Sequence, residues 1–183
     1  SSFGKKLIGA VAGFALARGA MRQFTSSLAN LDNIGKLSDR MEVDPNAIRG
    51  LQLMATQTGT SFATVEKGIQ RMARTIGEAR SGITTGTTAL KDMGLTVEDF
   101  DGMNVEQQLA FIADKLASIK DPTIRAAQAF RMFGRTGQEM TNMLALGSAG
   151  IKAYTDEAME LGGPISRDDI KRVEAANDAV DKM

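Results

Sequence analysis

The chain has 183 residues, balances 22 acidic against 22 basic side chains, and is 43% hydrophobic. This composition is typical of a soluble globular chain and argues against wholesale disorder. Because the sequence contains no Cys and no His, thiolate and imidazole chemistry and nearly every zinc or haem site are excluded. We expect no enzyme and no cofactor.

Charge is unevenly distributed along the chain. Residues 1–31 carry four basic side chains and no acid, since the first acid is Asp32, whereas residues 156–183 carry eight acids and four bases. A basic beginning and an acidic end suit an assembly protein. With no net positive charge, the chain has no global field that attracts nucleic acid, so we expect no sequence-specific nucleic-acid partner.

The first segment carries an apolar heptad pattern. Apolar residues recur at alternating spacings of four and three, which is the a/d seam of a coiled coil. This seam consists of Phe3, Leu7, Ala10, Phe14, Ala17, Met21, Phe24, Leu28 and Leu31. It ends where Gly35 and Ser38 take the next core positions. We expect one long amphipathic helix over residues 1–42 that associates with copies of itself, and packing on its own domain is the alternative.

The apolar run over residues 7–17 raises a further alternative. Lys5 and Lys6 precede it and an Ala-x-Ala ends it, as in a signal peptide, but eleven apolar residues are too few to span a bilayer. The chain begins with Ser1 rather than Met, which favours an internal piece of a longer protein. A membrane-active or pore-forming role for this segment stays open beside self-association.

Residues 43–183 are predicted to form a compact module of several short helices. Asp44 and Asp121 each precede a proline as an N-cap, and Ser61 and Asn104 cap two further helices. We expect residues 82–86 to form a loop. No stretch alternates with period two, so the predicted fold class is all-α. The later apolar faces are predicted to comprise Leu109, Ile112, Ala113 and Leu116; Ala126, Ala127, Ala129, Phe130 and Phe133; and Ile151, Tyr154, Ala158 and Leu161.

The stretch "FRMFGRTGQEM", residues 130–140, has the glycines of a phosphate-binding loop. A P-loop needs G-x-x-x-x-G-K-[ST] after a strand, whereas here the glycines are too close together and no Lys follows. A helix–helix corner accounts for the residues better. Gly134 would end one helix with positive φ, and Thr136 would cap the next with Glu139 in a capping box. We expect the corner motif, Phe133, Gly134, Arg135, Thr136 and Gly137, to contact no ligand.

Charged groups elsewhere offer little chemistry. Lys67, Arg71 and Arg74 form a basic stripe opposite the apolar face of their helix, as a solvated surface does. The acidic groups at 98–101 and 168–169 could serve a metal or a hydrolytic mechanism. Both lie in or near first turns, where acids favour the helix dipole. The sequence therefore predicts no catalytic, metal-binding or cofactor-binding residue.

Three stretches follow one another in a familiar order. The first is "LDNIGKLSDRMEVDPNAIRGLQLMATQTGTSFATVEKGIQRMARTIGEA", the second is "ALKDMGLTVEDFDGMNVEQQLAFIADKLASIKDPTIRAAQAFRMFGRTGQEMTNML", and the third is "ELGGPISRDDIKRVEAANDAVDKM". Their succession resembles the body of phage tail tape measure proteins, and "MFGRTG" is its most specific element. The resemblance covers residues 31–183. Departures are Asn104, where a proline-containing helix start is usual, and residues 41–43, which replace a Leu-Gly turn.

The resemblance implies a structural role. Tape measure proteins run inside the tail tube of long-tailed phages, set its length and scaffold tail assembly. It implies an extended, helical homo-oligomer, with a trimer favoured, whose partners are the tail tube and tail-tip proteins and the tail assembly chaperone, with transient membrane contact in some members. The implied location is the lumen of the virion tail, and the host cytoplasm during assembly, for a phage or a prophage.

Overall fold

A computed structural model of the chain describes residues 31–172 and residue 175. Over this part the regular secondary structure is helical and includes no strand, which confirms the all-α prediction. Residues 1–30 of the predicted long helix, with eight of the nine seam positions, lie outside the described residues.

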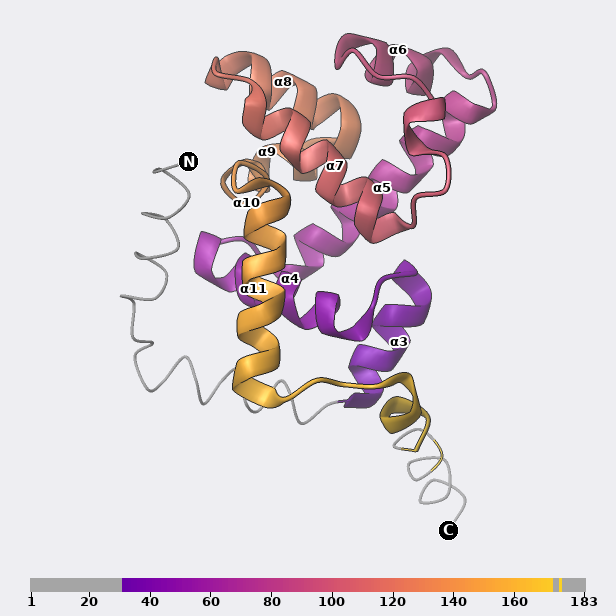
Figure 1. The fold of residues 1–183 in the computed structure, drawn as a ribbon. Coiled ribbons are helices and arrows are strands. Elements are labelled where there is room, and N and C mark those ends of the chain that lie inside the picture. Colours follow the sequence, from indigo (N-terminus) through magenta and orange to yellow (C-terminus); the bar gives the residue numbers. More distant parts are fainter. Residues whose placement is uncertain (1–30, 173–174, 176–183) are drawn as a thin grey trace.

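The described chain forms ten bounded helical segments. They are α3 (Leu31–Met41), α4 (Pro45–Thr58), α5 (Phe62–Arg80), α6 (Thr84–Asp92), the 3-10 turn η1 (Glu98–Phe100), α7 (Val105–Ser118), α8 (Pro122–Phe133), α9 (Arg135–Glu139), α10 (Thr141–Leu144) and α11 (Gly147–Gly162). Residues 167–172 are helical again. In Figure 1, α5 crosses the centre of the molecule, with α4 near one end and α6 near the other, while α11 packs along α4. Helix α8 contacts the middle of α5, where the Thr75 hydroxyl donates to the Met132 carbonyl.

Local capping explains where these helices begin. The predicted N-caps Asp44, Ser61, Asn104 and Asp121 are all confirmed, because each side chain accepts a hydrogen bond from a backbone N–H of the first turn. At α7 the capping is reciprocal. The Asn104 Oδ1 accepts from the Gln107 N–H at 2.8 Å, and the Gln107 Oε1 accepts from the Asn104 N–H at 3.0 Å.

The core is aliphatic and rich in thioethers. Six methionines are fully or almost fully buried: Met41, Met54, Met72, Met132, Met140 and Met143. Unbranched, polarisable side chains of this kind fill irregular gaps between short helices. The one tyrosine of the chain, Tyr154, is buried on α11, which packs against α4 and α7.

Helix α3 belongs to this core. Its Ile34, Leu37 and Met41 are buried, and α3 packs on α4 and α5. Gly35 and Ser38, where the heptad pattern ends, are buried inside α3, and the Ser38 hydroxyl donates to the Val43 carbonyl at 2.6 Å. Residues 31–41 therefore share one core with the helices that follow residue 43.

The structure corrects two features of the predicted module. The expected loop at residues 82–86 is wrong, because α6 begins at Thr84. Gly86 is buried in it so close to α5 that a Cβ there would lie 2.5 Å from the Thr75 carbonyl oxygen. Phe130 and Leu161 are 46% and 37% exposed, and Ala127 is exposed as well, so these residues do not lie on the buried faces where we expected them.

Candidate functional site

The corner between α8 and α9 contains the most specific motif of the sequence. Gly134 ends α8 with φ 67° and ψ −152°, a conformation open essentially to glycine alone. Its N–H donates to the Phe130 carbonyl at 2.7 Å, which closes the last turn of α8. The predicted positive φ at Gly134 is confirmed.

The predicted capping box at this corner is wrong. Helix α9 begins at Arg135 with Gly134 in the N-cap position, so Thr136 lies inside the helix and α9 has no side-chain cap. The Thr136 hydroxyl instead donates backward to the Phe133 carbonyl at 2.6 Å. Glu139 turns to α5, where its carboxylate accepts from the Thr64 hydroxyl at 3.3 Å. Because the chain re-enters a helix directly after Gly134, no extended residue is left to act as a cap.

Close packing fixes the corner on its neighbours. A Cβ at Gly137 would lie 2.6 Å from the Ala129 carbonyl carbon, and a Cβ at Gly134 would meet the Arg71 Cγ of α5 at 3.7 Å. Phe133 is buried and Arg135 is exposed. The two glycines are therefore explained by backbone conformation and by space, and the corner acts as a joint between α8, α9 and α5.

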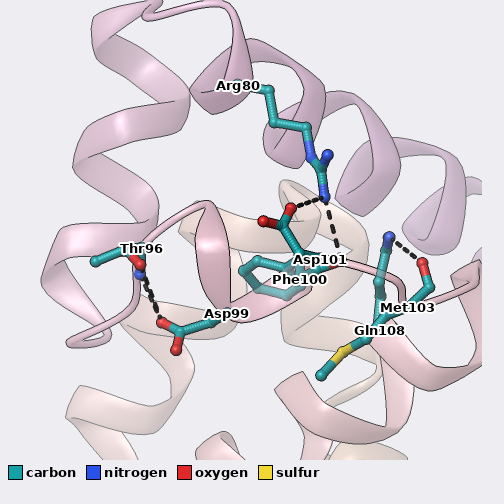
Figure 2. A network of polar contacts seen from close by, with 7 residues as sticks. All are labelled: Arg80, Thr96, Asp99, Phe100, Asp101, Met103 and Gln108. Carbon is teal, nitrogen blue, oxygen red and sulfur yellow. Dashed lines mark hydrogen bonds and ion pairs between the residues drawn. The ribbon is translucent and has the colours of Figure 1, made fainter.

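The acidic residues before α7 hold a turn (Figure 2). The Asp99 carboxylate accepts from the Thr96 N–H at 2.8 Å, and Asp101 pairs with Arg80 at 3.3 Å. The same guanidinium donates to the Phe100 carbonyl at 3.2 Å, and the Phe100 ring is fully buried. These carboxylates anchor a buried aromatic ring. No group of three or more acidic side chains in the described part is arranged to hold a metal ion.

The remaining charged candidates have similar roles. Lys67 and Arg74 of the basic stripe are exposed, and Arg71 reaches Glu78 at 3.8 Å. At the acidic pair 168–169, Asp169 accepts from the Ser166 hydroxyl at 2.6 Å, and hydrogen bonding by Ser166 lowers the pKa of that carboxyl. The stripe is a solvated face, and Asp169 belongs to a helix cap with Ser166.

A shallow groove of about 450 Å³ lies between the start of α7 and the middle of α11. Burial, and then the nearby charge of Asp44, raise the pKa of Glu106 on its wall. Lys152 on the opposite wall pairs with Asp156 at 2.7 Å. The groove has no ring of converging polar groups of the kind that fixes the orientation of a small ligand.

Sequence reasoning missed a clamp between α4 and the end of α11. Arg49 is 1% exposed, and its guanidinium donates to the Ala158 carbonyl at 2.7 Å and to the Gly163 carbonyl at 2.5 Å. Both carbonyls lie at a helix C-terminus, where orphan acceptors and the negative end of the dipole favour a cation. Burial lowers the pKa of Arg49.

One turn earlier on α4, Asn46 makes a paired contact with the chain after α11. Its Nδ2 donates to the Ile165 carbonyl at 3.0 Å, and its Oδ1 accepts from the Ile165 N–H at 2.8 Å. The apolar neighbours Ile48 and Leu51 were a sequence signal that this stretch of α4 is buried. The partners of Asn46 and Arg49 lie more than 100 residues further along the chain, so no local pattern could reveal them.

No protein-family description, curated protein or solved structure matches this chain. Within residues 31–172, no helix is both long and apolar enough to cross a bilayer. Leu31, the one seam residue in the described part, is partly buried against the core.

Proposed function

We propose that this chain is a structural segment of a phage or prophage tail tape measure protein, which sets the length of the tail tube and scaffolds tail assembly. The observation that carries the proposal is the corner motif at residues 132–137, set within an order of segments that resembles this family. Its glycines have demanding backbone positions: Gly134 needs positive φ and Gly137 has no room for a Cβ. A motif with such requirements is a stronger basis for resemblance than composition.

The use of the charged residues supports a structural role. Asp99, Asp101 and Asp169 are engaged in turns, an ion pair and a cap, and Arg49 secures a helix end. Side chains committed to holding helices together do not converge on a common substrate position, which a catalytic constellation requires.

Self-association through the seam is part of the proposal. The seam ends at Leu31, the first residue of α3, and α3 is anchored in the core by Ile34 and Leu37. A helix that continues the heptad pattern back from α3 presents the seam to copies of the chain, with a trimer favoured. Length measurement requires such a long bundled helix, since each helical residue adds about 1.5 Å.

Light scattering of the full 183-residue chain tests the association. We expect a trimer for the natural chain and a monomer for the double variant Phe14→Asp, Met21→Asp, with helical circular dichroism retained from the module. The matched control Gln23→Asp, Ser26→Asp places the same charges off the seam and keeps the trimer. A natural chain that is monomeric at high micromolar concentration contradicts the seam assignment.

Tail length in the complete parent protein tests the function itself. Removing residues 7–27, which is three heptads and preserves the seam phase, shortens tails by roughly 30 Å. Duplicating the same residues lengthens tails by the same amount. Electron microscopy of the tails measures both, and tails of unchanged length in both variants rule out a tape measure role.

A further inference from the structure

The segment after α11 is bound to α4 mainly through its backbone. Residues 163–172, the C-terminal strap, leave the end of α11 and run toward the side of the molecule where α3 lies (Figure 1). Ile165 and Ile170 of the strap are 9% and 6% exposed. They belong to the same apolar cluster as the helices.

Asn46 and Arg49 on α4 form the slot, the site that binds the strap. Every hydrogen bond that the slot makes to the strap ends on a main-chain atom: the Ile165 N–H and carbonyl, and the Gly163 carbonyl. Contacts of this kind recognise an extended peptide through its backbone, and the side chains on alternate residues add specificity. A strap that presents Ile165 and Ile170 satisfies the slot whichever copy of the chain it comes from.

A glycine hinge separates the strap from α11. Gly163 follows Gly162 and has φ 73° and ψ 160°, a conformation suited to glycine. Pro164 comes next and opposes continuation of the helix. A Cβ at Gly163 would meet nothing within 4 Å, so this turn is set by backbone conformation rather than by surrounding packing. The turn between α11 and the strap lies at the surface, where Gly162 is exposed.

Leaving the slot empty is unfavourable. Release of the strap removes the Gly163 carbonyl from a guanidinium that is 1% exposed and leaves it with the Ala158 carbonyl, and a buried donor that loses its acceptor is unfavourable. It also exposes two isoleucines. A strap from a second copy restores all of these contacts, which is the condition for exchange of an identical element between protomers.

We propose that the slot on α4 is an exchange site that binds the strap of a second copy of this chain. Exchange is favoured where copies are held side by side, because tethering raises the effective concentration into the millimolar range. This inference does not rest on the proposed tail function. It is tested in chains whose seam is disabled by Phe14→Asp and Met21→Asp, so that association through the seam does not contribute.

Shortening the hinge is the first test. Deleting Leu161 and Gly162, which are exposed at the end of α11, prevents the strap of the seam-disabled full chain from returning to its own slot and keeps the Gly163 carbonyl that Arg49 binds. We expect light scattering to show a doubled mass, which falls to the monomer value when Ile165→Asp and Ile170→Asp are added. The control with two glycines inserted after Gly163 stays monomeric. A shortened chain that remains monomeric at high micromolar concentration, or a dimer that survives the isoleucine changes, overturns the proposal.

A second measurement does not need the shortened hinge to fold. The probe is a fluorescent peptide of residues 161–172, and its anisotropy reports binding to the full-length, seam-disabled chain with Ile165→Asp and Ile170→Asp. We expect binding about tenfold tighter than to the chain with its natural strap, whose slot is filled, and a loss of about tenfold when Asn46→Ala is added, since tenfold corresponds to the loss of one or two hydrogen bonds. Equal affinity for all three proteins overturns the proposal.

Discussion

Gly50 of α4 lies directly against the main chain of Thr155 in α11. A Cβ at position 50 would be 2.6 Å from the Thr155 Cα and 2.7 Å from its amide nitrogen. Both residues are inside helices, so neither backbone can move aside locally. This approach sets the spacing of α4 and α11, which make the most extensive helix–helix contact among the described residues.

Gly50→Ala is expected to destabilise the fold. Overpacking against a backbone costs about 1–3 kcal/mol, and contacts of 2.6 and 2.7 Å to main-chain atoms place this case toward the upper end. The better helix propensity of Ala recovers up to about 1 kcal/mol, so the net loss is up to about 2 kcal/mol. Gly77 of α5 is the matched control, because a Cβ there meets nothing within 4 Å, and Gly77→Ala should gain roughly 0.5–1 kcal/mol. Urea unfolding measures both, and midpoints that move in the same direction refute the packing role of Gly50.

Gly134→Asn is expected to destabilise the α8–α9 corner. The conformation at φ 67° and ψ −152° costs a residue with a Cβ about 1–3 kcal/mol. Gly59 also has positive φ, but its φ 74° and ψ 22° lie in the left-handed helical region, which Asn tolerates. Thermal unfolding should therefore show a small change for Gly59→Asn and a clearly larger one for Gly134→Asn. Equal changes would show that the corner does not need this glycine.

The contribution of Glu106 to the free energy of unfolding is expected to depend on pH. Burial and the Asp44 charge raise its pKa in the folded chain, so the folded state holds its proton to higher pH than the unfolded state does. Stability from this group is therefore present at low pH and is lost as the pH rises through the raised pKa. Glu106→Gln should stabilise the fold at neutral pH by under about 1 kcal/mol, since Glu106 is partly exposed to solvent. The gain should vanish below about pH 4.

Asp169 is the control, because its contribution to folding stability has the opposite dependence on pH. Hydrogen bonds from Ser166 lower the pKa of Asp169, so the stability it contributes is present at neutral pH and is lost as the pH falls through the lowered value. Asp169→Asn should therefore destabilise at neutral pH and become neutral in acid. Urea unfolding at several pH values measures both variants, and a pH-independent effect of Glu106→Gln refutes the electrostatic explanation.

Asn104→Ala is expected to cost about 1 kcal/mol through loss of the α7 cap. The reciprocal bond from the Asn104 N–H to Gln107 depends on the same turn, so circular dichroism should also show fraying at the start of α7. Asn142→Ala provides the comparison, because Asn142 is exposed in α10 and should change the unfolding midpoint little. A neutral Asn104→Ala contradicts the capping assignment.

The predictable features of this fold are the local ones. Asp44, Ser61, Asn104 and Asp121 act on amides within three residues, so their roles can be inferred from short patterns. The predicted Thr136 cap was wrong because the T-x-x-E spacing does not distinguish an N-cap from a residue inside the first turn. In the structure Gly134 occupies the N-cap position, which places Thr136 inside α9.

The features that sequence reasoning missed depend on distant partners. Gly86 was expected in a loop because glycine is common there, but it lies inside α6. It is a glycine because the Thr75 carbonyl of the neighbouring helix leaves room only for a hydrogen atom. Arg49 has the appearance of a surface charge, and its acceptors lie 109 and 114 residues away.

The buried phenol of Tyr154 makes this chain a single-reporter protein. The sequence has one Tyr and no Trp, so intrinsic tyrosine emission and phenolate absorbance come from one position on α11. Burial, followed by the charge of Glu157, raises the pKa of that phenol, which delays its ionisation in an alkaline titration for as long as α11 stays docked. Unlabelled protein thus carries its own optical probe of helix docking, separate from the global helical signal.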